Sequence, residues 1–350
     1  MFIFLQNIFL DKYIPSFVTM FTVSKNILVT GSSGFIGFNL SKRLLNEGHN
    51  VTGIDSFNEA YDPSFKRIRQ QILKKDSNFK DYELNLDIYK NLEYIKDTED
   101  VNYDIVFHLA ARAGVRQSFL DPVSYIKDNA IATTNVANFV KECEIKKLVL
   151  ASTSSIYGNS GTNKMIEGVD EKIEPPSIYA ASKLSGEVFA KNILENSETN
   201  VIITRFFTVY GPFGRPDMSV LRFIHWIVEG KKVNLFGDGK QSRSFTYIDD
   251  VTELLILCKS VNTDCTLNVG NNQTSTLIEV IEYIEEATNT KANIDYQERA
   301  YKDPDIVLPS LENTKNITGW SPKTDIKSGV ENTVKWYFEN RDLIKNLKYL

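Results

Sequence analysis

The sequence is poor in cysteine and histidine. Only three of its 350 residues are cysteines and three are histidines, and neither set has the close spacing of metal ligands. This scarcity excludes a disulfide scaffold, predicts no metal centre, and indicates a reducing, cytoplasmic location. His108 ends a stretch of apolar residues, so we expect its side chain to be packed inside the fold.

Long apolar runs and long basic runs are also missing. Residues 1–24 are rich in apolar side chains, but Asp11, Lys12 and Pro15 interrupt them well short of the ~20 residues that span a bilayer. We interpret them as an N-terminal extension of unknown role: an upstream start, a membrane-surface anchor or a packing arm. They lack the features of a signal peptide. Because the net charge is −5 without a basic cluster, we expect neither an integral membrane span nor a nucleic-acid partner.

What the chain does contain is an alternation of strand and helix signals. Strands are predicted at 25–30, 50–55, 81–86, 104–109, 147–151 and 201–206. Helices are predicted from about residue 35 and at 64–75, 124–141 and 179–195. This rhythm predicts an α/β fold built on a Rossmann doubly wound parallel sheet. After residue 210, turn-rich segments and short helices predict a smaller C-terminal lobe.

A glycine-rich turn marks a candidate nucleotide site. Gly31, Gly34 and Gly37 follow the first strand and open the first helix, where glycines let the backbone approach a pyrophosphate. Asp55 ends the second strand about 20 residues later, where a carboxylate binds ribose hydroxyls and repels a 2′-phosphate. The pattern therefore predicts NAD rather than NADP. Further cofactor contacts, for which simple packing is the alternative, are predicted at Phe35, Ile36, Asp87, Ile88, Leu109, Ala110 and Ala111.

Tyr179 and Lys183 lie four residues apart and thus on one face of a helix. A free tyrosine has a pKa near ~10, too high for a base at neutral pH, and a neighbouring cation favours the phenolate. Thr153, just past the fifth strand, can add a hydroxyl that bridges to a substrate hydroxyl. With the glycine turn, these three candidate catalytic residues predict hydride chemistry at a carbinol carbon.

Three further segments carry a family resemblance: His108–Ser118, Arg205–Met218 and Arg243–Asp250. Over about residues 25–340, the chain resembles the extended short-chain dehydrogenase/reductases, in particular their NAD-dependent nucleotide-sugar epimerases and dehydratases. It is most similar to the UDP-glucuronate 4-epimerases. The middle segment is the most specific, because many relatives have Asn at the position of Thr208 and lack the Gly-Arg-Pro-Asp-Met run that contains Arg215. In the third segment, Ser244 stands where the family usually has Asp.

The resemblance implies the reversible C4 epimerisation of UDP-glucuronate to UDP-galacturonate through a 4-keto intermediate, with NAD reduced and reoxidised in each turnover. Thr153 and Tyr179 would contact the 4-hydroxyl and Lys183 the nicotinamide ribose. Arg243 would pair with the diphosphate. Donors around the C5 carboxylate would keep the 4-keto acid from losing carbon dioxide. Those donors would be Ser154, Ser155, Thr208 and Arg215.

The resemblance also implies domain functions and an oligomeric state. Residues 25–210 would form the NAD-binding Rossmann domain. Residues 211–350 would mainly form the lobe that binds the UDP-sugar, with a possible strand near 267–270 that returns to the main sheet. A homodimer is implied, through the helices around 124–141 and 179–195.

Other functions on the same fold would call for different residues at some of these positions. A 4,6-dehydratase or a UDP-glucuronate decarboxylase would commonly carry a carboxylate after the catalytic Thr, where this chain has Ser154 and Ser155. A UDP-glucose 4-epimerase stays open, although Thr208 and Arg215 favour an acidic sugar. A non-catalytic NAD-sensing scaffold would be expected to have a damaged catalytic set. The sequence does not define the polysaccharide pathway that the product would enter.

Overall fold

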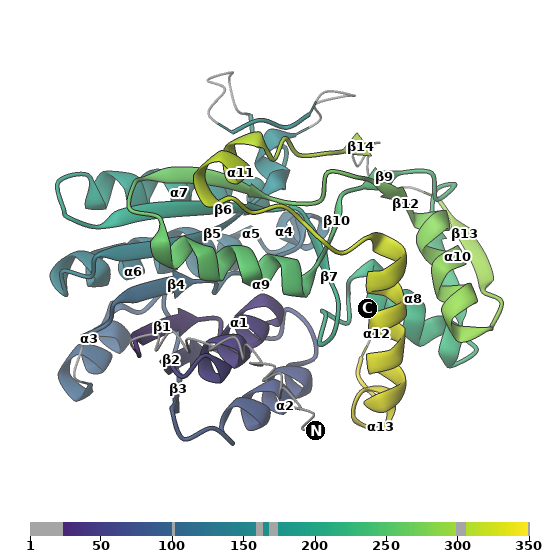
Figure 1. Cartoon of the computed structure of the whole chain (residues 1–350), viewed down its shortest axis with the longest axis horizontal. Coiled ribbons are helices and arrows are strands. Elements are labelled where there is room, and N and C mark those ends of the chain that lie inside the picture. The colour runs from purple at the N-terminus through teal and green to yellow at the C-terminus, as the bar shows by residue number, and fades with distance from the viewer. Residues whose placement is uncertain (1–23, 100–101, 159–163, 168–173, 299–305, 349–350) are drawn as a thin grey trace, which may run out of the picture.

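A seven-stranded sheet forms the centre of the computed structural model, which describes residues 24–99, 102–158, 164–167, 174–298 and 306–348 (Figure 1). The predicted N-terminal extension, except Ser24, lies outside the described residues. All neighbouring strands in the order β11-β6-β5-β4-β1-β2-β3 are parallel, which confirms the predicted Rossmann sheet. The strands are β1 (Asn26–Thr30), β2 (Asn50–Asp55), β3 (Phe79–Glu83), β4 (Ile105–His108), β5 (Lys147–Thr153), β6 (Asn200–Phe206) and β11 (Cys265–Val269).

Helices cover both faces of this sheet, as a parallel sheet requires. Because side chains alternate along a strand, Ile27 and Val29 of β1 join one apolar cluster and Leu28 joins the other. The first cluster is completed by α1 (Phe35–Asn46), α2 (Pro63–Leu73) and α9 (Ile248–Leu257). The second is completed by α3 (Tyr89–Thr98), α6 (Ala132–Glu142) and α7 (Ile178–Leu194).

The third strand begins and ends earlier than the predicted 81–86. Its register is set by β2, which pairs Val51 with Phe79 and Asp55 with Glu83. Since β2 ends at Asp55, the ladder ends there too. Residues 84–87 continue as a loop that lines a large cavity, so the end of the predicted strand borders a candidate site and does not extend the sheet.

The predicted helix 124–141 is interrupted. After α4 (Val115–Leu120), the chain forms α5 (Pro122–Tyr125), a π-helical turn η1 (Ile126–Ile131) and then α6. π-helical turns redirect side chains and are frequent near functional sites. Here Asn129 of η1 accepts a hydrogen bond from the Arg112 amide (2.8 Å) and donates one to Ser182 Oγ (2.9 Å). The turn therefore ties the loop after β4 to α7.

The C-terminal part of the chain builds a smaller lobe beside one end of the sheet, where α8, α10 and α12 stand together (Figure 1). Its helices are α8 (Ser219–Val228), α10 (Leu277–Thr288), α12 (Ile326–Glu339) and α13 (Arg341–Ile344), whereas α11 (Glu312–Thr318) packs against β11 of the central sheet. Its strands are β7 (Thr208–Tyr210), β8 (Lys232–Phe236), β9 (Ser242–Arg243), β10 (Phe245–Tyr247), β12 (Ser275–Thr276), β13 (Asn293–Gln297) and β14 (Ile306–Val307). Two short 3-10 turns are η2 (Ser154–Tyr157) and η3 (Cys258–Ser260).

Residues 248–269 leave the lobe and return to the sheet. Helix α9 packs against α1, and β11 pairs with β6 at the position where a returning strand near 267–270 was predicted. The functional division near residue 210 stays a prediction, but two elements after that residue belong to the Rossmann layers.

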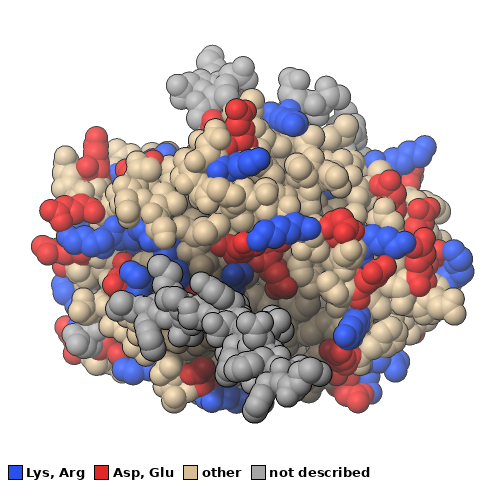
Figure 2. All heavy atoms as spheres, in the orientation of Figure 1, with Lys and Arg blue, Asp and Glu red and all other residues tan. Residues whose placement is uncertain are grey.

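Charges of both signs are mixed on the face shown in Figure 2, so the net charge of −5 is not gathered there into one patch. Over the described ranges, no helix combines the length and apolar character needed to cross a bilayer. The same ranges contain no cluster of three or more His, Cys, Asp or Glu side chains suited to a metal ion.

Candidate active site

A cavity of about 1110 Å³ lies between the carboxyl ends of the sheet strands and the lobe. Open α/β sheets bind their ligands at this edge. Its volume exceeds the roughly 300–1,000 Å³ of a site for one drug-sized ligand, which suits a cofactor together with a substrate. It is lined by every predicted site residue except Ile88: Gly31, Gly34, Phe35, Ile36, Gly37, Asp55, Asp87, Leu109, Ala110, Ala111, Thr153, Ser154, Ser155, Tyr179, Lys183, Thr208, Arg215 and Arg243.

Ile88, a predicted cofactor contact, does not line the cavity. It is 49% exposed and immediately precedes α3. The reason is the early end of β3, after which residues 84–87 pass the cavity and Ile88 already turns outward at the start of the helix.

The glycine turn has no room for side chains. Gly31 has φ of +70°, and a Cβ added there would lie 2.8 Å from the Ala110 amide nitrogen. A Cβ on Gly37 would lie 2.0 Å from the Gly31 carbonyl oxygen. Glycine at these two positions lets the turn, the helix and the loop after β4 pack closely. Helix α1 then begins at Phe35 without an acidic residue in its first turn, so its positive end can receive a phosphate.

Two carboxylates, those of Asp55 and Asp87, suit the ribose and the adenine of a dinucleotide. Asp55 accepts hydrogen bonds from the Ser33 amide (3.1 Å) and the Phe57 amide (2.9 Å), which fix it beside the glycine turn. Each carboxylate oxygen can accept further bonds from ribose hydroxyls. Asp87 Oδ1 is buried without a hydrogen-bond partner among the described residues, and the residue lines the cavity. A buried acceptor of this kind needs a donor, and the amino group of an adenine is one.

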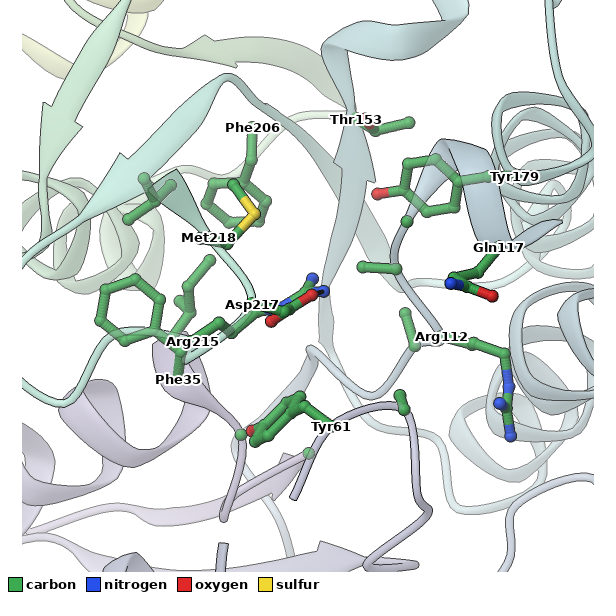
Figure 3. Close-up of a pocket in the computed structure, with 18 of the residues that line it drawn as sticks. Phe35, Tyr61, Arg112, Gln117, Thr153, Tyr179, Phe206, Arg215, Asp217 and Met218 are labelled. Carbon is green, nitrogen blue, oxygen red and sulfur yellow. Dashed lines mark hydrogen bonds and ion pairs between the residues drawn. The ribbon is translucent and has the colours of Figure 1, made fainter. Parts of the chain in front are cut away.

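The candidate catalytic residues come from β5 and α7. Tyr179 lies in the first turn of α7, which Ser177 caps by accepting a bond from the Ala180 amide (3.1 Å). In Figure 3 the Tyr179 hydroxyl points into the cavity on the side of Thr153. Thr153 ends β5, accepts a hydrogen bond from the Ser155 amide (3.1 Å) and donates one to the Ser155 hydroxyl (3.2 Å).

The electrostatics around Tyr179 include a cation to which the sequence assigned another role. Burial raises the pKa of Tyr179, while its hydrogen bond with Thr153 and the charge of Arg215 act to lower this pKa. Arg215 therefore favours the phenolate of Tyr179. Lys183 is itself buried, which lowers its pKa to about 8, and the charge of Glu187 one helical turn away opposes that shift.

The predicted carboxylate-binding groups gather in the same cavity, but Arg215 already has a carboxylate partner. Its Nε and Nη2 donate to the two carboxylate oxygens of Asp217 at 3.0 and 2.5 Å. On another side, the Tyr61 ring centroid lies 5.8 Å from the guanidinium carbon (Figure 3). Thr208 stands at the start of β7 and lines the cavity as predicted.

Arg243 lines the cavity from β9, the central strand of a small sheet with β12 and β14. Its Nη1 donates to the Ser242 carbonyl (2.9 Å). Ser244, which departs from the family's usual Asp, is fully buried; its hydroxyl donates to the Asn271 carbonyl (2.8 Å) and accepts from the Asn271 amide (2.7 Å). The small side chain thus joins two loops directly beside Arg243.

Sequence reasoning assigned no role to several charged or aromatic residues of the cavity. Lys66 donates to Asn58 through the carbonyl (2.8 Å) and Oδ1 (2.7 Å), and burial lowers its pKa to about 8. Arg112 pairs with Asp128 (2.8 Å). Asp217 could have been noticed, because it stands two residues from Arg215 in the most specific segment. Lys66 of α2 and Arg112 of the loop after β4 are brought to the site only by the fold.

Comparison with known proteins agrees with this site. Residues 27–270 match the NAD dependent epimerase/dehydratase family. A UDP-glucuronate 4-epimerase of Thermodesulfobacterium geofontis is 39% identical over 323 residues, 92% of this chain and 98% of that protein. The UDP-glucuronic acid 4-epimerase of Bacillus cereus, solved with UDP-glucuronic acid and NAD, superposes with a TM-score of 0.82 at 30% identity, over 90% of this chain and 99% of that one.

A UDP-glucose 4-epimerase of Thermotoga maritima, solved with UDP-glucose, gives the same TM-score of 0.82 at 26% identity, over 90% of this chain and 99% of that one. The fold alone therefore does not separate the two sugar specificities. The family match covers well over half of the chain, and the relative from T. geofontis is similar over nearly its whole length. The chain belongs to the NAD-dependent epimerase/dehydratase family.

Proposed function

We propose that this protein is a UDP-glucuronate 4-epimerase that interconverts UDP-glucuronate and UDP-galacturonate. One observation carries the proposal: the cavity that holds Thr153, Tyr179 and Lys183 is also lined by four donors suited to a carboxylate, Ser154, Ser155, Thr208 and Arg215. The similarity to proteins named UDP-glucuronate 4-epimerase supports it.

The proton of the C4 hydroxyl is handled by this chain's own side chains. A bound NAD would supply the redox chemistry, serving as acceptor for the C4 hydride and, once reduced, as its donor to the opposite face of the 4-keto sugar. Tyr179 Oη takes the hydroxyl proton and later gives it back, with Thr153 holding the hydroxyl. Since burial raises the pKa of Tyr179, the phenolate needs positive charge, which Arg215 supplies here.

The donors around the carboxylate protect the intermediate. A 4-keto uronate is a β-keto acid, and it loses carbon dioxide when the bond to the carboxyl carbon stands perpendicular to the ketone plane. Directional donors from η2, β7 and Arg215 can hold the carboxylate away from that geometry while the ring turns. Preorganised donors of this kind favour epimerisation over decarboxylation.

Product analysis tests the proposal. The NAD-loaded protein is incubated with UDP-glucuronate, and separately with UDP-glucose. We expect UDP-galacturonate from the first, without net NADH or carbon dioxide, and at most slow conversion of the second. UDP-xylose as the main product would replace the proposal with a decarboxylase, and preferred conversion of UDP-glucose would replace it with a UDP-glucose 4-epimerase. Retained NAD without any turnover would indicate a binding protein.

We also infer that the chain forms a homodimer through α4, α5, η1 and α7, which pack against one another. Large apolar side chains on these elements are exposed, namely Phe119, Leu120, Val123, Ile126, Ile131, Val188 and Phe189. Phe189→Glu is expected to give monomers in sedimentation experiments, while Phe338→Glu on α12 leaves the dimer intact. A wild-type monomer would contradict the inference. The cytoplasmic location remains a prediction from the cysteine pattern.

A further inference from the structure

The pairing of Arg215 with Asp217 leaves only part of the guanidinium for a ligand. An arginine carries five N–H donors, of which Asp217 occupies one on Nε and one on Nη2. No other residue in the described part of the chain takes the donors on Nη1 or the second donor on Nη2, and these form the edge of the fork that a second carboxylate can engage at two points. Both residues are 18% exposed and line the cavity.

The backbone just before Arg215 is held in place by Arg69. Arg69, which is fully buried, donates from Nη2 to the Phe213 carbonyl (2.7 Å) and the Gly214 carbonyl (3.1 Å). Its Nη1 donates to Tyr61 Oη (2.6 Å), whose ring lies beside the Arg215 guanidinium. The loop and one side of Arg215 are therefore held in place. The contact that sets the rotation of the guanidinium plane is the two-point bond to Asp217.

We propose that Asp217 is a positioning residue that turns the free edge of Arg215 toward the substrate carboxylate. The inference rests on the proposed function. Asp217 also offsets part of the attraction that Arg215 exerts on an acidic sugar, so the pair holds the carboxylate more by direction than by net attraction. Substrate binding would then depend little on Asp217, whereas control over the 4-keto intermediate would depend on it strongly.

Asp217→Asn separates these two effects. With UDP-glucuronate we expect kcat for UDP-galacturonate to fall by about ten- to a hundredfold, because a misplaced positioning group costs this much. KM stays unchanged or falls, since Arg215 keeps its charge. Carbon dioxide and trapped NADH per turnover rise. A raised KM with unchanged kcat and no carbon dioxide would overturn the inference.

A double-mutant cycle shows whether Asp217 acts through Arg215. In an Arg215→Ala background, Asp217→Asn is expected to change kcat and the carbon dioxide fraction by less than about twofold. An equal effect in both backgrounds would overturn the inference and point to another partner, such as Arg222, which feels the charge of Asp217. Glu83→Gln is the matched control, because it removes the carboxylate of an exposed two-point pair with Arg67 (2.6 and 2.8 Å).

The proposed function and the proposed role of Asp217 are tested by different measurements, so one can be wrong without the other. The wild-type product decides the function, and the ratio of variant to wild type decides the role of Asp217. If the wild type does not convert UDP-glucuronate, the orientation of Arg215 is instead observed in crystal structures of the NAD-loaded wild type and Asp217→Asn with UDP-glucuronate. A two-point contact of Arg215 with the sugar carboxylate that is lost in the variant supports the inference, and an unchanged contact overturns it.

Discussion

Glu187 and Arg205 form a buried two-point ion pair that joins α7 to β6. Arg205 donates from Nε to Glu187 Oε1 (3.0 Å) and from Nη2 to Oε2 (2.7 Å), and the two side chains are only 9% and 4% exposed. Ser152 of β5 donates to the same carboxylate. Because Lys183 lies one helical turn before Glu187 and Thr153 follows Ser152, the pair fixes the helix and the strand that carry the catalytic set.

Removal of Glu187 should therefore destabilise the protein strongly. Glu187→Ala leaves the Arg205 guanidinium buried without its counterion, so we expect the free energy of unfolding to fall by about 3–5 kcal/mol. Urea unfolding measures the loss. Glu198→Ala is the control, because the Lys146–Glu198 pair is exposed, and no measurable change is expected from it. A loss no larger than the control's would show that the buried pair contributes little.

Tyr179→Phe tests the proton transfer. The substitution removes one oxygen from a half-buried ring that lines the cavity, so we expect NAD to remain bound while kcat falls by about 10²- to 10⁴-fold, the usual contribution of a general acid or base. Turnover is followed by product separation and NAD by its absorbance after denaturation. Tyr89→Phe, on α3 and outside the cavity, should keep full activity. Full activity in Tyr179→Phe would refute the role of the hydroxyl.

Most of the fold could be predicted because its signals are local. Buried strands such as 147–153 and 200–206 contain the short apolar runs 148–151 and 201–203, and the glycine turn is defined by residues that tolerate no Cβ. The extent of β3 could not be predicted from the sequence, because pairing with β2 sets its register. The π-helical turn in 124–141 was also missed, since its reason is the pair of contacts that Asn129 makes with residues on two other elements.

At the site, the sequence pointed to residues that the structure brings together, but not to their partners. Tyr179, Lys183 and Arg215, which the motifs singled out, line one cavity. The motifs did not show that Arg215 is bound by Asp217, or that the charge of Glu187 acts on the buried Lys183. Those relations depend on burial and on loop geometry, which determine how far each charge acts.

Arg215→Ala tests the carboxylate-binding role. Without the guanidinium the 4-keto acid is held less firmly, so we expect carbon dioxide and NADH to accumulate during incubation with UDP-glucuronate. KM should also rise, because Asp217 then faces the substrate carboxylate unpaired. The double variant Arg215→Ala/Asp217→Asn removes that repulsion and should restore part of the affinity while still releasing carbon dioxide. A change in KM alone, in both variants, would contradict the role.

His108 should make the stability of the fold depend on pH. Its ring is fully buried between Thr30 Oγ1 (2.7 Å) and Thr133 Oγ1 (3.0 Å), and burial with the charge of Lys183 lowers its pKa to about 3. An unfolded histidine binds its proton near pH ~6.5. The unfolded chain therefore binds more protons than the folded one between pH 3 and 6.5. The contribution of His108 to stability is full above pH 6.5 and is lost as the pH falls toward 3.

His225, with a pKa lowered to about 4, acts in the same direction, so the contribution of His108 has to be isolated by substitution. Urea unfolding of the wild type and of His108→Gln between pH 7.5 and 4 measures it: we expect a smaller slope of stability against pH in the variant, and equal slopes would show that His108 is not held neutral by the fold.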